Sequence, residues 1–168
     1  MGLRSENREL FRTMTAGCSI ISLLELVCTM RSIIIFIKRD WKNIRRSDYS
    51  DRRVLLVEDN DLNREIASEI IGMTGASVEI VENGREAVER IENASENWYD
   101  IVFIINGYEA TAAIRALPGR RGQIPIIAMT ANAFAEDVQL AKNTGMDEHI
   151  AKPLDFEKLN TVMEKYLN

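Results

Sequence analysis

From residue 53 onward the chain alternates short apolar runs with helical patterns, and this alternation constrains the fold more than any other feature of the sequence. The apolar runs are rich in β-branched residues and lack regular polar alternation, which is typical of parallel strands buried on both faces. Each run precedes a segment with apolar residues at helical spacing. The expected strands are 53–59, 77–82, 101–105, 124–130 and 148–153, and the expected helices are 62–73, 83–94, 108–117, 132–145 and 156–167.

Strand–helix units of this kind predict an α/β fold. Five of them in about 115 residues fit a flavodoxin-like, doubly wound (βα)5 three-layer sandwich with a parallel sheet in the order 2-1-3-4-5. Asp155 suits an N-cap of the last helix, and Gly75 and Gly145 suit left-handed helix ends. We expect residues 51–168 to form this domain and residues 1–50 to form an N-terminal helical extension, a leader or linker.

Four polar residues fall where the expected strands end. Glu58 and Asp59 follow the first strand, Thr130 ends the fourth, and Lys152 lies at the end of the fifth. Carboxylates are ligands that Mg²⁺ prefers, while a hydroxyl and an ammonium bind phosphate oxygens. Taken singly, an acidic pair after a strand is more often a solvated turn. The four together at one edge of one sheet favour a site for Mg²⁺ and a phosphoryl group.

Four segments carry a resemblance to a known family: "VLLVEDNDLNREIA", "NGYEATAAIRAL", "IPIIAMTANAF" and "GMDEHIAKPLDFEKL". Together they resemble the receiver domain of two-component response regulators, most of all the receivers at the ends of hybrid sensor histidine kinases, over about residues 53–167. The resemblance implies that Glu58 and Asp59 hold Mg²⁺, that Thr130 and Lys152 contact the phosphoryl group, and that His149 occupies the switch position. It also implies a histidine kinase, a phosphotransfer protein or a downstream protein as partner, in a bacterial signalling system.

The stretch "YDIVFIINGYEATAAIR" departs from that family. The resemblance implies a phospho-accepting aspartate at the end of the third strand, followed by a loop with a Met-Pro pair. Here Ile105 meets Asn106 directly, and Gly107 follows. Asp100 precedes the strand, so at ~3.3 Å per residue it lies roughly 16 Å from the edge with Glu58. The sequence therefore predicts a receiver without its acceptor, in which any Mg²⁺ binds weakly.

Three functions remain open at this point. The domain is a degenerate phosphorelay receiver that cannot be phosphorylated, a phosphorylation-independent pseudo-receiver that binds a protein, or a fragment of a truncated hybrid histidine kinase. We expect no enzymatic activity of its own, because the nucleophile is missing.

The charges are divided unevenly along the chain. Residues 1–53 hold 11 basic and 6 acidic residues, a net of +5, whereas residues 54–168 hold 10 and 20, a net of −10. So acidic a domain argues against nucleic acid as a partner. Two cysteines, Cys18 and Cys28, give no disulfide framework and favour a reducing, cytoplasmic setting.

The leader is harder to interpret. Its apolar stretch, residues 16–37, approaches the length of a membrane span, but Glu25 and Arg31 interrupt it. A membrane-associated helix, a linker or association helix, and a segment without a selected function all remain open. The short segment 118–123, "PGRRGQ", is expected to be a solvated loop.

Overall fold

The computed structural model describes residues 48–105, 107–130, 135–152 and 154–168. The leader, with Cys18, Cys28 and the apolar stretch 16–37, lies outside the described residues, so its interpretation stays a prediction. Within the described ranges, no helix has the length and apolar character needed to cross a bilayer.

Five strands and five α-helices alternate along the described chain, as the sequence predicts. The strands are β1 (Arg53–Val57), β2 (Ser77–Val81), β3 (Ile101–Ile104), β4 (Ile126–Thr130) and β5 (Glu148–Ala151). The helices are α3 (Asp61–Gly72), α4 (Gly84–Asn93), α5 (Tyr108–Arg115), α6 (Ala135–Thr144) and α7 (Phe156–Leu167), with a 3-10 turn, η2 (Gly119–Gln123), before β4.

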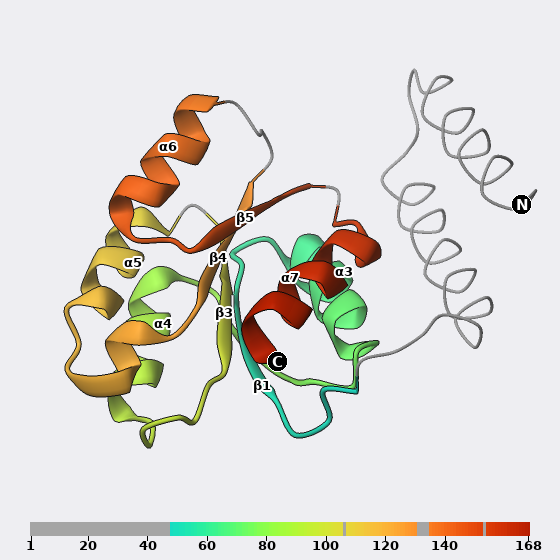
Figure 1. The fold of residues 1–168 in the computed structure, drawn as a ribbon, viewed down its shortest axis with the longest axis horizontal. Coiled ribbons are helices and arrows are strands. Elements are labelled where there is room, and N and C mark those ends of the chain that lie inside the picture. Colours follow the sequence, from blue (N-terminus) through green and yellow to red (C-terminus); the bar gives the residue numbers. More distant parts are fainter. Residues whose placement is uncertain (1–47, 106, 131–134, 153) are drawn as a thin grey trace, which may run out of the picture. The chain divides into compact units, whose positions relative to one another are not determined.

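The strands form one parallel sheet in the order β2-β1-β3-β4-β5. Helices α3 and α7 cover one face of this sheet, and α4, α5 and α6 cover the other (Figure 1). The flavodoxin-like three-layer sandwich predicted from the sequence is therefore confirmed. Because all strands run the same way, their carboxyl ends meet at one edge of the sheet and their amino ends at the other.

Two apolar clusters form the core, one on each face of the sheet. The first packs α3 and α7 against alternate residues of the strands, including Leu56, Phe103 and Met129. The second packs α4, α5 and α6 against the residues between them, including Leu55 and Val102. This two-sided burial explains why the strands read as continuous apolar runs.

The helix ends follow the signals in the sequence. Asn60, Asn83 and Asp155 each cap a helix by accepting a hydrogen bond from a backbone N–H of the first turn. Gly75 and Gly145 follow α3 and α6 with φ angles of 90° and 97°, in the left-handed region.

Two local details differ from the expectation. Residues 118–123 are expected to be a solvated loop; most of them are exposed, but Gly119–Gln123 forms the 3-10 turn η2, in which Gly122 is buried. The third strand is expected to include Ile105, but β3 ends at Ile104 and Ile105 is only partly buried.

Tyr49 extends the domain beyond its predicted start. The compact unit spans Arg46–Asn168, whereas the sequence placed the start at residue 51. The Tyr49 ring is 2 % exposed within the cluster under α3 and α7, and its backbone N–H donates to the Thr74 carbonyl at 3.1 Å. A truncated chain should therefore begin at Arg46, since a start at residue 51 would leave the space of the Tyr49 ring empty.

Candidate functional site

The carboxyl edge of the sheet brings together three of the polar residues singled out in the sequence. Glu58 follows β1, Thr130 is the last residue of β4, and Lys152 follows β5. The Lys152 backbone N–H donates to the Thr130 carbonyl at 2.7 Å, so the ends of these two strands stay paired.

Glu58 is a buried carboxylate with partners on both oxygens. Its side chain is 1 % exposed, and Oε2 accepts a hydrogen bond from Lys152 Nζ at 2.9 Å. Oε1 accepts from the Asn60 backbone N–H at 3.2 Å and from Asn63 Nδ2 at 3.3 Å. A buried charge is tolerated when it is paired and hydrogen-bonded in this way, and removing one partner is strongly destabilising.

Asp59 does not share this environment, because its side chain is exposed while that of Glu58 is buried. The two acids therefore differ although they are neighbours in sequence, and their joint role as metal ligands stays a prediction.

The first turn of α3 supplies groups that the sequence analysis missed. Besides the Asn60 and Asn63 contacts, Arg64 Nη1 donates to the Glu58 carbonyl at 3.1 Å. Arg64 also pairs with Asp61 in its own helix and with Glu82 at 3.6 Å. The signal that could have found Asn60 is its capping position, since an N-cap Asn fixes where the first turn lies relative to the strand before it.

His149 lies on β5 and is half-buried. Its Nδ1 is 3.9 Å from Glu148 Oε1, and Glu148 also accepts a hydrogen bond from Lys165 Nζ at 2.7 Å. The hydrogen bond from Lys165, opposed in part by burial, holds the pKa of Glu148 below its usual range. No described contact joins His149 to Glu58 or Lys152, so its switch role stays a prediction.

The end of β3 runs almost directly into α5. The Ile105 N–H donates to the Val57 carbonyl at 3.2 Å, and Gly107 is already the N-cap of α5; Asn106 lies outside the described residues. A Cβ on Gly107 would lie 2.0 Å from Ile104 Cδ1, so no larger residue fits there without displacing Ile104. The junction carries no acidic residue between Ile101 and Gly107.

Asp100 lies at the opposite edge, before β3, as the sequence predicts. Its Oδ2 accepts a hydrogen bond from the Arg53 backbone N–H at 2.8 Å, and its Oδ1 accepts from Arg52 Nη1 at 3.2 Å. Both carboxylate oxygens thus tie the starts of β1 and β3 together. Asp100 is separated from Glu58 by the length of the strands.

The described residues at the carboxyl edge offer Mg²⁺ a poor site. Mg²⁺ demands octahedral oxygen coordination and gains most from carboxylates that can turn toward it. Here both Glu58 oxygens are engaged, and the Lys152 ammonium already supplies positive charge to that carboxylate. Across the described ranges, no group of three His, Cys, Asp or Glu side chains is close enough to hold a metal ion.

We expect the full chain to bind Mg²⁺ only weakly. Relative to a site with three carboxylates, the loss of one charge at ~4 Å from a divalent ion removes roughly 8 kcal/mol of gross Coulomb attraction at an effective dielectric of about 20, before desolvation offsets much of it. Calorimetric titration with MgCl₂ should give no stoichiometric heat, and Glu58→Gln should titrate like the unmodified chain. Tight binding that Glu58→Gln abolishes would contradict this expectation.

Known proteins resemble this chain over the folded domain. A model of the family described as response regulator receiver domain matches residues 54–164. The rice (Oryza sativa subsp. japonica) "Two-component response regulator ORR41" is 35% identical over 122 residues, which cover 68% of this chain and 93% of that protein. "Probable histidine kinase 1" of Oryza sativa subsp. indica is 29% identical over 151 residues, but these cover only 15% of the kinase. The chain spans between 7% and 15% of the length of the first curated histidine kinases it matches.

Solved structures agree with the sequence relatives. The receiver domain of the sensor histidine kinase PA1611 from Pseudomonas aeruginosa, solved with a magnesium ion in its active-site cleft, is 32% identical with a TM-score of 0.62. That match covers 69% of this chain and 97% of the other. The curated relatives named above are plant proteins, so a bacterial source for this chain stays a prediction.

Proposed function

The chain belongs to the response regulator receiver domain family, and from that premise we propose that it is a receiver of two-component signalling that does not itself accept a phosphoryl group. The observation that carries this proposal is the 2.9 Å ion pair between Lys152 and the buried Glu58, at an edge where β3 passes directly into α5.

Phosphoryl transfer to a receiver needs a carboxylate nucleophile beside the groups that stabilise the transferred charge. The β3–α5 junction offers none, and Asp100 is engaged by Arg52 and Arg53 at the far edge. Under the proposal, Thr130 and Lys152 keep the positions of phosphoryl-contact residues, but no phosphoryl group reaches them. Glu58 and Asp59 likewise keep the positions of metal ligands.

Lys152 supports the proposal in a second way. Its ammonium neutralises Glu58, and its backbone N–H bonds Thr130, so the ends of β1, β4 and β5 are joined without a metal or phosphate. Because no phosphoryl group is needed to join these strand ends, the surface of β5 and α7 keeps one conformation and is open to a partner at all times. We therefore infer a pseudo-receiver that binds a histidine kinase, a phosphotransfer protein or a downstream protein constitutively. The proposal carries three further expectations. The chain has no enzymatic activity of its own, it does not bind nucleic acid, and it works in the cytoplasm.

A second candidate is a receiver that works within a longer hybrid histidine kinase. It is favoured by two relatives named as hybrid signal transduction histidine kinases, of which this chain covers 7% and 8%. In that case the domain would meet its partner within one polypeptide, and the leader would connect the two.

The proposal predicts that the purified chain gains no phosphoryl mass. We expect intact-mass spectrometry after incubation with acetyl phosphate and Mg²⁺ to show only the unmodified chain, because the sequence places no carboxylate at the end of β3 and Glu58 is already paired with Lys152. A related receiver with its acceptor aspartate, treated in parallel, should gain one phosphoryl group. A stoichiometric gain by the native chain would refute the proposal, and loss of that gain in Asp100→Asn would show that β3 is used in another register.

A further inference from the structure

The amino edge of the sheet holds a pocket that the phosphorelay function does not use. It has a volume of about 490 Å³ and lies where β1, β3 and β4 begin. Its lining comes from three loops: Arg52, Asn97, Tyr99, Asp100, Arg120, Gln123, Ile124 and Pro125. At ~3.3 Å per residue the four or five residues of each strand separate this pocket from the edge with Glu58 and Lys152.

The pocket lies among the basic residues of an otherwise acidic domain. Four arginines gather at this edge, and three of them have partners that hold them in place. Arg52 bonds Asp100 and the Leu167 carbonyl, Arg53 stacks over the Trp98 ring at 3.5 Å, and Arg121 Nε donates to the Ala94 carbonyl at 3.2 Å.

Arg120 is the fourth arginine, and its described partner is an amide rather than a carboxylate. The side chain is exposed, and its Nη1 donates to Asn97 Oδ1 at 3.2 Å. No carboxylate of the described residues forms an ion pair with it. Asn97 itself has a φ of 63°, in the left-handed region that Asn adopts more readily than most residues, so its amide is presented by a defined turn.

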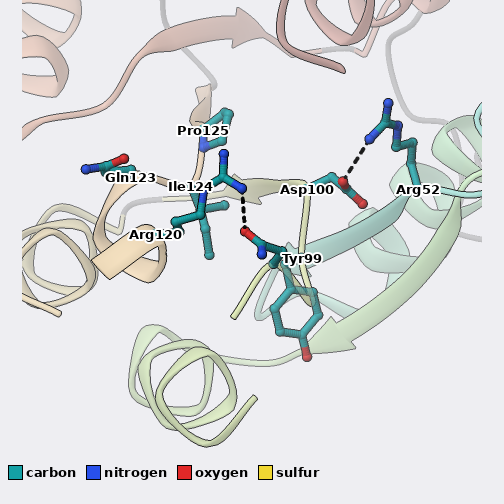
Figure 2. Close-up of a pocket in the computed structure, with 8 residues that line it drawn as sticks. Arg52, Tyr99, Asp100, Arg120, Gln123, Ile124 and Pro125 are labelled. Carbon is teal, nitrogen blue, oxygen red and sulfur yellow. Dashed lines mark hydrogen bonds and ion pairs between the residues drawn. The ribbon is translucent and has the colours of Figure 1, made fainter. Parts of the chain in front are cut away.

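The other lining groups give the pocket a polar side and an apolar side. Figure 2 shows Arg120 on the same side as Ile124 and Pro125, with the Arg52–Asp100 pair on the other side. The Tyr99 hydroxyl points away and donates to Glu79 at 2.7 Å, so only the body of that residue lines the pocket. Among the residues that line the pocket, the positive charge of Arg52 is offset by Asp100. The lining therefore has a net charge of +1, which Arg120 carries.

We propose that this pocket binds a small organic monocarboxylate with a compact apolar body, held by the Arg120 guanidinium and packed against Ile124 and Pro125. A guanidinium matches the planar, bidentate geometry of a carboxylate. A dianion fits less well, because Asp100 lines the same pocket and would repel the second charge. The volume lies within the range of pockets for small ligands.

Titration of the full chain with benzoate, and with benzamide as its neutral isostere, tests the proposal. We expect benzoate to shift the backbone amides of Gln123 and Ile124 in NMR spectra and to bind at least about tenfold more tightly than benzamide, as a charge-assisted fork implies. Arg120→Gln should weaken benzoate binding by about tenfold while leaving benzamide unchanged.

The matched control is Arg85→Gln, which removes the same charge from an exposed position on α4. It should leave benzoate affinity unchanged. The proposal is overturned if benzoate does not bind, if Arg120→Gln binds it as well as the unmodified chain, or if the shifted amides belong to the edge with Glu58 and Asp59.

Discussion

Insertion of an aspartate-bearing segment between Ile105 and Asn106 should convert a chain that takes up no phosphoryl group into one that does so in a Mg²⁺-dependent way. The segment would hold an aspartate, a Met-Pro loop and enough spacing to reach Gly107. Because the Ile105 N–H already bonds the Val57 carbonyl, the next residue would emerge beside Glu58. The new carboxylate would supply both the nucleophile and a further ligand for Mg²⁺.

The same insertion also changes the partner of Lys152. With a second carboxylate present, Lys152 can bond a phosphoryl oxygen while Mg²⁺ neutralises Glu58 in its place. Intact-mass spectrometry after treatment with acetyl phosphate should show one phosphoryl group, and chelation of Mg²⁺ should abolish the gain. Lys152→Ala in the repaired chain should weaken the change that phosphorylation causes at the β5 and α7 surface. Because this substitution also removes a partner of the buried Glu58, its unfolding free energy has to be measured in parallel.

The control for this experiment is the same insertion with asparagine in place of aspartate. It has the same length and shape but no nucleophile, so it should gain no mass. Uptake by the asparagine variant would show that another residue is the acceptor. A folded aspartate variant that still gains nothing would show that more than the β3–α5 segment has been lost from the site.

Replacement of Arg115 by methionine should destabilise the domain by about 2–4 kcal/mol, because its guanidinium serves several acceptors at once. Its guanidinium donates to three backbone carbonyls, those of Gly145 at 2.8 Å, Gly122 at 3.0 Å and Ile124 at 2.8 Å. It also pairs with Asp147 Oδ2 at 2.7 Å.

Methionine keeps most of the apolar stem of Arg115 but satisfies none of these acceptors, so groups that are partly shielded from water lose their partners. Asp147 Oδ2 also accepts from the Ile126 N–H at 2.8 Å, and that bond at the start of β4 would weaken with the loss of its neighbour.

Thermal and urea unfolding, followed by circular dichroism, should show a decrease in Tm of roughly 10 °C. Arg85→Met, at an exposed position of α4, should change the unfolding free energy by less than about 0.5 kcal/mol. Equal effects of the two substitutions would contradict the assigned role of Arg115.

Sequence reasoning located the strands and helices because burial and spacing are local properties. A strand such as Ile101–Ile104, buried on both faces, has to be apolar at every position. The start of α7 could be predicted because Asp155 is a typical N-cap residue. The 3-10 form of the segment Gly119–Gln123 was not predicted because it depends on contacts with residues outside the turn: Arg115 donates to the Gly122 carbonyl, and Arg121 donates to the Ala94 carbonyl.

The candidate site could be predicted only in outline. The sheet topology places Glu58, Thr130 and Lys152 at one edge, and that much follows from the order of the strands. The sequence could not show that Glu58 points inward and Asp59 outward, because both face choices fit an extended pair. Nor could it show Lys152 bonded to Glu58, since that contact joins residues 94 positions apart. The pocket around Arg120 was missed for the same reason, since three loops separated in sequence form it.

The two apolar clusters have a consequence for how such genes are counted. Neither cluster includes Glu58, Asp59, Thr130 or Lys152, so the apolar core is distinct from the side chains that would react. Purifying selection on abundance would therefore keep the core and the buried Glu58–Lys152 pair, while the exposed Asp59 would be free to change. A census of signalling capacity that scores whole-domain similarity would count this chain as a relay step whether or not it accepts a phosphoryl group. Scoring the residue at the end of the third strand would separate receivers that accept a phosphoryl group from pseudo-receivers that only bind a partner protein.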